Sequence, residues 1–219
     1  MNAPTRMLFL VIVLLCCTLL ACRGALIVNW LNEPIWLNAD PPPVIGQPDL
    51  YDIDMDGNGT IDFSFSGIWH VLVDFRSESS NRYLIRPSPP PNTGGPVAAL
   101  ELGFYIGADS GNDSLDWFGD NYDYWSGLML NLYPGEAGEF WGRRAYIGVE
   151  FQSDDGIHYG WFDVEGGTSG PDAVIRGWGY ESTPGMGLIA GAIPEPSTLI
   201  LFGAGATAIF LSRCKRKIR

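Results

Sequence analysis

The stretch YIGVEFQSDDGIHYGWFDVE, residues 146–165, consists of two β-rich runs joined by four turn residues. Ser153, Asp154 and Asp155 are common turn formers, and Gly156 supplies the left-handed backbone position that follows a type I turn in a hairpin. Aromatic and β-branched residues are frequent in both runs, as expected for strands. The stretch therefore predicts an antiparallel β-hairpin.

The register of this hairpin decides which side chains are buried. If Gln152 faces Ile157, six apolar side chains share one face, because successive residues of a strand point to opposite sides. On the other face Trp161 lies opposite Gly148, where the missing side chain leaves room for the indole ring. We expect the first face to be the core, formed by Ala145, Ile147, Val149, Phe151, Phe162 and Val164.

Further β-rich runs, separated by turn residues, occupy much of the chain, and no stretch shows a convincing helical period. This spacing indicates an all-β fold with an antiparallel β-sandwich or jelly-roll-like core. The run 97–108 would also suit a short helix, but Gly103 and the aromatic residues after it favour a strand. The expected strands lie within residues 61–75, 82–86, 97–108, 125–133, 144–151, 157–165 and 173–181.

The N-terminal end of the chain has the composition of a targeting segment. Residues 1–23 combine Arg6 with an apolar run over residues 7–21, which is the layout of a secretory signal peptide and predicts a signal helix. A buried N-terminal helix is one alternative. Lipidation of Cys22 is another, because the preceding Leu-Leu-Ala resembles a bacterial lipobox, although Leu20 is larger than the residue usual there.

The C-terminal end predicts a membrane anchor. Residues 197–211 carry no charge, and as a helix they would span about 22 Å, less than the roughly 30 Å of a bilayer core. Snorkelling basic side chains can close such a gap, so we expect a short transmembrane helix with a cytoplasmic tail. The basic residues of that tail are Arg213, Lys215, Arg216, Lys217 and Arg219. The expected division is residues 1–23, an exported domain over 24–193, and a sorting segment over 194–219.

The exported domain is strongly acidic. Residues 24–193 contain six Arg and no Lys against 24 Asp and Glu, a net charge of −18. Such a domain repels nucleic acid and anionic lipid, and it suits cations or a hydrated extracellular layer. All four Cys lie in the two ends, so we expect neither a disulfide nor thiol chemistry in the domain. Its stability must come from its core, with a bound metal as a further contribution.

The sequence DMDGNGTIDFSF, residues 54–65, nearly matches the calcium loop of an EF-hand. Oxygen donors stand at the first, third, fifth, seventh and ninth positions, as calcium requires. The twelfth position, where a bidentate Glu is needed, holds Phe65, and neither flank predicts a helix. We therefore expect weak, structural calcium binding. The expected donors are Asp54, Asp56, Asn58, Thr60 through its carbonyl, and Asp62, with Asp52 as a substitute.

The loop also has an interpretation without a metal. Asp and Asn side chains stabilise turns by accepting backbone hydrogen bonds, so the loop could be a solvated polar turn. A second acidic stretch over residues 108–124 fits no ligand spacing, and we expect it to be a solvated loop with interspersed aromatic residues.

No motif in the sequence indicates catalysis. His70 and His158 are the only histidines, and we expect both to be structural. The Gly-Thr-Ser-Gly of residues 167–170 meets Pro171 where a nucleophile elbow needs Gly, and no zinc-binding pattern occurs. A glycosidase needs only two carboxylates at a set separation, so it stays an alternative. We expect a protein that is not an enzyme.

The C-terminal region resembles the PEP-CTERM sorting signal. Pro194-Glu195-Pro196, the apolar segment and the basic tail stand in the order of that signal over residues 193–219. The resemblance implies a Gram-negative bacterium, Sec export, transient holding in the inner membrane and cleavage by an exosortase. It also implies an association with exopolysaccharide and biofilm, and the preceding residues look like the body of many such proteins, to which the resemblance assigns no activity.

Three functions follow from these observations. The first is a non-enzymatic surface or matrix-associated β-protein with a calcium-stabilised turn. The second is a carbohydrate-binding, lectin-like module that uses Trp117, Trp125 and Trp178, although core packing would also explain those residues. The third is a glycosidase-like enzyme.

Overall fold

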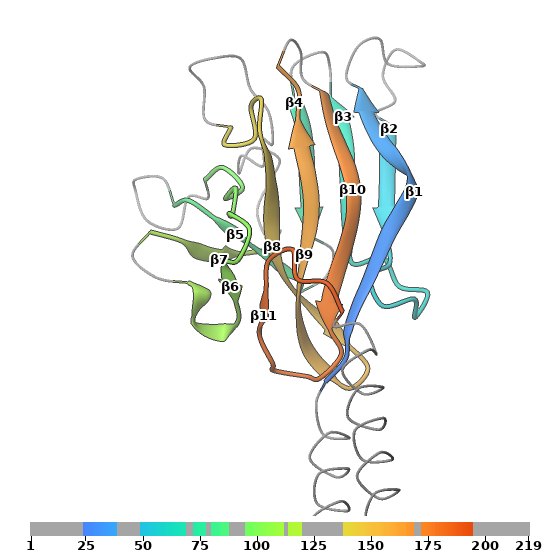
Figure 1. The fold of residues 1–219 in the computed structure, drawn as a ribbon, viewed down its shortest axis with the longest axis vertical. Coiled ribbons are helices and arrows are strands. Elements are labelled where there is room, and N and C mark those ends of the chain that lie inside the picture. The colour runs from blue at the N-terminus through green and yellow to red at the C-terminus, as the bar shows by residue number, and fades with distance from the viewer. Residues whose placement is uncertain are drawn as a thin grey trace, which may run out of the picture.

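The computed structural model describes residues 24–38, 49–68, 72–77, 80–87, 95–111, 114–119, 138–168 and 172–194. Within these ranges the regular secondary structure consists of β-strands and one short 3-10 turn (Figure 1). The elements are β1 (Leu26–Asn38), β2 (Asp49–Ile53), β3 (Phe63–Ile68), β4 (Leu72–Ser77), β5 (Arg82–Ile85), β6 (Tyr105–Ile106), the 3-10 turn η1 (Ala108–Ser110), β7 (Asp116–Phe118), β8 (Arg144–Ser153), β9 (Gly156–Gly166), β10 (Asp172–Glu181) and β11 (Leu188–Ile189).

The strands pair antiparallel in three sheets. The main sheet has the order β1-β10-β9-β8-β5-β7, a second sheet has the order β2-β3-β4, and β11 pairs with β6. Figure 1 shows β2, β3 and β4 behind the main sheet. The predicted all-β, antiparallel class is confirmed. The jelly-roll-like connection stays a prediction, and the two terminal helices fall outside the described residues.

The hairpin predicted at residues 146–165 is the centre of the main sheet. Strands β8 and β9 pair from Arg144 opposite Glu165 to Ser153 opposite Gly156, with Gln152 facing Ile157 as predicted. Gly156 has a φ of 142°, which a side chain would strain. All six side chains assigned to the inner face by this register are buried in one apolar cluster.

The second sheet covers this inner face. The rings of Phe63 and Phe65 on β3 lie edge-on to Phe162 on β9, with centroid separations of 5.6 and 5.3 Å. Edge-to-face contacts of this kind add to the free energy gained by burial. Because Phe63 and Phe65 are two residues apart, both point to the same side of β3, and this alternation turns the whole sheet towards the core.

A smaller cluster lies on the other face of the main sheet. Leu100, Ile106 and Leu188 pack there with Trp161 and Tyr146. The backbone at Leu100 forms a bridge to Tyr146 and so holds residues 97–106 against β8. Part of the main sheet is therefore buried on both faces, which explains why β9 carries apolar residues at successive positions.

The space around Trp161 differs from the prediction. Trp161 does lie opposite Gly148 in the register, but a Cβ on Gly148 would lie 2.8 Å from Leu100 Cδ1 and 2.9 Å from Leu84 Cδ1. The indole ring instead lies over Gly179 of β10, where an added Cβ would be 2.8 Å from its Cζ2. Gly148 thus makes room for leucines, and Gly179 makes room for the tryptophan.

Two other predicted strands need correction. The run 61–75 forms β3 and β4, which pair with Ile68 opposite Leu72, so the chain reverses within one apolar run. The run 97–108 contains two isolated bridges, the short β6 and the start of η1, instead of one strand or helix. The predicted strand at 125–133 lies outside the described residues.

Strand β1 escaped prediction, as did β2, β7 and β11. The register between β1 and β10 shifts between Trp30 and Ile35, a stretch that includes Pro34. Proline has no N–H to donate, so it occurs at edges and irregularities of sheets. The interruption breaks the alternation by which a strand is found in a sequence.

No helix among the described residues has the length and apolar character needed to cross a membrane.

We predict that Gly179→Ala destabilises the domain more than Gly148→Ala. An added Cβ at Gly179 meets the rigid Trp161 ring and lies 3.0 Å from the Ile27 carbonyl oxygen, whereas at Gly148 it meets the mobile ends of two leucines. Overpacking costs about 1–3 kcal/mol, so we expect a loss of about 2 kcal/mol for Gly179→Ala and less than about 1 for Gly148→Ala. Denaturant unfolding of both variants checks this, and an equal loss would contradict it.

Candidate metal site

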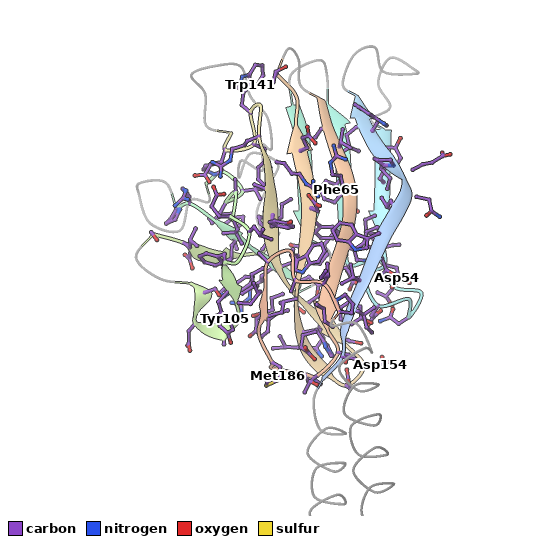
Figure 2. All side chains as sticks on the ribbon, in the orientation of Figure 1. Asp54, Phe65, Tyr105, Trp141, Asp154 and Met186 are labelled. Atoms are coloured by element: carbon purple, nitrogen blue, oxygen red, sulfur yellow. The ribbon has the colours of Figure 1, made fainter. Side chains whose placement is uncertain are left out.

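The aspartate loop connects β2 to β3 at one end of the second sheet (Figure 2, Asp54 labelled). Ile53 and Phe63 face each other as the last pair of the two strands, and the Asp62 N–H donates to the Ile53 carbonyl at 2.9 Å. The loop is therefore the turn of a β-hairpin with strands on both sides. This agrees with the prediction that no helix flanks it.

The fold brings three of the predicted donors together. Oxygens of Asp54, Asp56 and Asp62 all lie within 4.8 Å of one another. Asp54 and Asp56 are half-buried, and Asp62 is 1% exposed. Three carboxylates at such separations repel one another, and a hard cation between them would remove that repulsion.

Backbone N–H groups partly compensate the charge on Asp54. Its Oδ1 accepts from Gly57 at 2.8 Å and from Asn58 at 3.2 Å, and its Oδ2 accepts from Gly59 at 2.7 Å. The chain can wrap around one carboxylate in this way because Gly57 and Gly59 have φ values of 79° and 90°. Asx hydrogen bonds thus give the loop its shape, as its interpretation as a polar turn requires.

Asp62 is the least solvated of the three carboxylates. Its Oδ2 accepts from the Met55 N–H at 2.9 Å, and its Oδ1 accepts from Asn81 Nδ2 at 3.1 Å. Burial, together with the charges of Asp56 and Asp54, raises the pKa of Asp62 from 3.8 to about 6, although the two hydrogen bonds act in the opposite direction. Asp62 therefore carries a charge at neutral pH only at a cost in free energy.

Two residues outside the loop fasten it to the main sheet. Ser153, at the end of β8, donates from Oγ to Asp56 Oδ2 at 2.5 Å. Asn81 donates to Asp62 and also accepts from the Gln152 N–H at 2.9 Å, so one side chain joins the loop to β8. The sequence pattern identified neither role. Ser153 belongs to a recognisable turn, but Asn81 stands before a short strand without any local signal.

The remaining predicted donors point elsewhere. Asn58 Oδ1 accepts from the Thr60 N–H at 2.7 Å, and both residues are exposed. Asp52 accepts from the Ser64 hydroxyl at 2.8 Å across the β2–β3 pair and is not part of the carboxylate cluster. Phe65, at the position that corresponds to the twelfth of an EF-hand loop, is fully buried in the core and cannot be a ligand.

The oxygen donors that the structure brings together for a cation are thus the three clustered carboxylates and the Ser153 hydroxyl, which lies 2.5 Å from Asp56 Oδ2. Such a set contains only oxygen and suits calcium or magnesium rather than zinc or copper. It offers fewer protein ligands than the six to eight oxygens calcium takes, so water would complete the shell.

His158, the described member of the two histidines, is buried and structural. Its Nδ1 lies 2.8 Å from the Glu181 carbonyl and its Nε2 lies 2.7 Å from Asp155 Oδ1. The hydrogen bond from His158 lowers the pKa of Asp155. The ring also stacks on Phe151 at 5.5 Å. Nδ1 thus links β9 to β10, and Nε2 links β9 to the turn that precedes it. His70 lies outside the described residues.

Other predicted site residues fall into two groups. Trp117 is half-buried beside Tyr159, and Trp178 packs on the inner core, so neither presents an open ring. Pro194 is exposed at the end of the described chain. The predicted residues that lie outside the described ranges are Cys22, Trp125, Glu195, Pro196, Arg213, Lys215, Arg216, Lys217 and Arg219.

Residues 192–217 match the family model of the PEP-CTERM protein-sorting motif. No curated protein and no solved structure matches the chain. The predicted resemblance of the C-terminal region is confirmed, and the chain carries a PEP-CTERM sorting motif. The motif implies an exported protein that an exosortase processes.

We predict that Asp62 makes the calcium-free protein less stable as the pH rises. The pKa of Asp62 is about 6 in the folded state and 3.8 ordinarily, so the folded state binds the proton more tightly. The proton on Asp62 therefore adds roughly 3 kcal/mol to the free energy of unfolding below about pH 4. This contribution is lost as the pH rises through 6. Asp62→Asn cannot ionise and should lack this loss.

Denaturant unfolding in chelator at pH 4.5 and pH 7.5 tests the prediction. The free energy of unfolding of Asp62→Asn, relative to wild type, should rise by about 2 kcal/mol between the two pH values. Asp116→Asn, at an exposed position away from the loop, should show almost no such change. A constant difference between wild type and Asp62→Asn would contradict the assignment.

Proposed function

We propose that this chain is a non-catalytic surface or matrix-associated protein whose exported domain is stabilised by calcium bound in the loop at residues 54–62. The sorting motif at residues 192–217 supports the destination. The observation that carries the calcium proposal is the convergence of Asp54, Asp56 and Asp62 within 4.8 Å. The proposal follows the sequence prediction in cation and in role.

The proposed role of calcium is structural because of where the loop sits. Asp62 directly precedes β3, whose Phe63 and Phe65 fill the core, and Asp56 contacts Ser153 in the central hairpin. A cation at the carboxylates would neutralise charge beside Asp62 and so favour its ionised, hydrogen-bonded form. It would thereby stabilise the junction between the two sheets.

The environment outside the cell suits a weak site. Extracellular calcium modules bind in the range of about 10⁻⁴–10⁻³ M, where a site with incomplete protein ligands is still occupied. The net charge of −18 over residues 24–193 attracts cations to the domain generally and keeps it hydrated. Both features support a place in a hydrated layer at the cell surface.

The structure near the sorting motif supports access by a processing enzyme. The Ala192 N–H donates to the Ile189 carbonyl at 3.0 Å, and Ile193 is 63% exposed. Pro194, the first residue of the Pro-Glu-Pro triplet, is also exposed. In the proposed course, residues 194–219 anchor the chain in the inner membrane until the exosortase removes them.

Millimolar calcium should raise the thermal stability of the full chain. A ligand that binds only the folded state at a hundred times its Kd stabilises it by about 2.7 kcal/mol. The double variant Asp54→Asn, Asp56→Asn should abolish this rise in stability, because it removes two of the three carboxylate charges at the site. Asn is chosen because its side-chain oxygen can still accept hydrogen bonds from the N–H groups of residues 57–59. Melting curves in calcium and in chelator, at equal ionic strength, measure the rise.

Asp109→Asn with Asp116→Asn is the matched control, because both residues are exposed and removing them changes the net charge by the same amount. This variant should keep the full calcium increment. Melting curves of the wild type that coincide with and without calcium would overturn the proposal and leave the loop as a polar turn.

Export should remove the C-terminal segment in a host that has an exosortase. The motif at residues 192–217 predicts cleavage near Pro194, so the exported protein should lack residues 213–219. Mass spectrometry of the exported and the membrane-bound forms measures the mature end. Pro194→Ala with Pro196→Ala should retain the basic tail, and a wild-type export product that still carries this tail would contradict the sorting proposal.

A further inference from the structure

The outer face of the main sheet, opposite the β2–β3–β4 sheet, carries two exposed tryptophans on β1. Trp36 is 64% exposed and Trp30 is 46% exposed, whereas Leu37, the next residue after Trp36, is fully buried in the core. Trp36 therefore points away from the core. Figure 1 shows β11 and its loop in front of the lower end of this sheet. The upper end, where β1 ends beside the start of β10, lies away from that loop.

Two ion pairs on this face of the sheet are held in fixed positions, and the one made by Arg176 lies beside Trp36. Arg176, at the irregular position of β10, donates from Nε to Glu165 Oε2 at 3.0 Å, and its Nη2 contacts the same oxygen. On the neighbouring strands, Arg144 donates through Nε and Nη2 to the two carboxylate oxygens of Asp163 at 2.8 and 2.5 Å. Asp163 is fully buried, which makes this bidentate pair rigid.

A shallow hollow joins Trp36 to the first of these pairs. It has a volume of about 210 Å³ and is lined by Trp36, Glu165, Thr168 and Arg176, together with backbone of residues 166–167. The side chains of Arg176 and Glu165 are 37% and 42% exposed, so each keeps part of its polar surface in solvent while being held by the other. The hollow therefore combines an open aromatic ring with oriented donors and acceptors.

The local charge of this face differs from that of the domain. Arg144 and Arg176 balance Asp163 and Glu165, whereas residues 24–193 as a whole carry −18. These two ion pairs are thus neutral together, while the surrounding domain repels acidic polymers. An uncharged ligand is the one that this distribution favours.

We propose that Trp36, Glu165 and Arg176 form a binding site for a neutral polysaccharide. The C–H face of a pyranose ring is apolar, and it would stack on the indole of Trp36, which offers a large, rigid and solvated surface. The hydroxyls of the sugar can donate hydrogen bonds to the Glu165 carboxylate and accept them from the Arg176 guanidinium. Trp30, on the same strand, would extend the contact along the polymer.

This site is separate from the loop at residues 54–62 and from the sorting motif. It also differs from the sugar contacts predicted from the sequence, because Trp117 is half-buried and Trp178 is packed on the core. The inference consequently stands or falls independently of calcium binding and of export.

The test is affinity electrophoresis of the full chain, purified in detergent with calcium present. Native gels contain dextran, xyloglucan, galactomannan or laminarin as neutral probes and alginate as an acidic one. We expect retardation by at least one neutral polymer and none by alginate. Trp36→Ala should weaken that retardation at least tenfold, and Glu165→Gln should weaken it less, because the amide keeps an acceptor.

Tyr105→Ala is the matched control, because Tyr105 is an aromatic residue of β6 that is 55% exposed elsewhere on the surface. It should leave retardation unchanged. Trp36→Ala should keep the wild-type melting temperature and calcium increment, since the side chain is mostly in solvent, so a loss of binding would not reflect unfolding.

Several outcomes would overturn the proposal. They are the absence of retardation by all four neutral polymers, equal retardation of wild type and Trp36→Ala, and retardation by alginate alone. Sedimentation of the same samples measures the oligomeric state. If the wild type is a dimer and Trp36→Ala is a monomer, the face binds a second copy of the chain and the polysaccharide proposal is wrong.

Discussion

The antiparallel pairing of β8 with β9 is the interaction on which the rest of the structure depends. Its ten residue pairs, from Arg144–Glu165 to Ser153–Gly156, send alternate side chains to two different clusters. Phe162 on one side receives the phenylalanines of β3, and Trp161 on the other receives Tyr146 at a centroid separation of 5.5 Å. A slip of one residue would exchange the two faces and remove both clusters at once. The turn at Asp154–Asp155 therefore fixes far more than its own two strands.

The same dependence explains what could be predicted from the sequence. The hairpin was predictable because turn chemistry and alternation act over neighbouring residues, and Gly156 marks the register directly. The reversal of the chain between β3 and β4 was not predictable, because both strands begin in one β-rich run over residues 61–75 with no recognisable turn residues between them. Nor could the sequence reveal that Asn81 joins Asp62 to Gln152, since those contacts link residues 19 and 71 positions apart. The three aspartates of the loop were predicted from spacing, whereas Asn81 and Ser153, which fasten the loop to the main sheet, come from distant parts of the chain.

The loop and the core constrain each other. Met55, inside the acidic loop, is 1% exposed, and a Cβ on Gly160 of β9 would lie 2.8 Å from its Cε. The loop is thus pressed onto the main sheet by an apolar side chain, and this contact carries Asp62 out of water. An exposed acidic turn would have had little effect on stability, whereas a buried carboxylate next to two others couples local charge to the packing of both sheets.

The last short strands determine how the folded body meets its sorting segment. Strand β11 pairs with β6, the Ala190 N–H donates to the Phe104 carbonyl at 2.8 Å, and Ala190 is fully buried. The chain is consequently held at Ala190, four residues before the Pro-Glu-Pro triplet. Because Leu188 and Ala190 belong to the cluster around Trp161, the sorting motif begins directly after residues that pack against the main sheet.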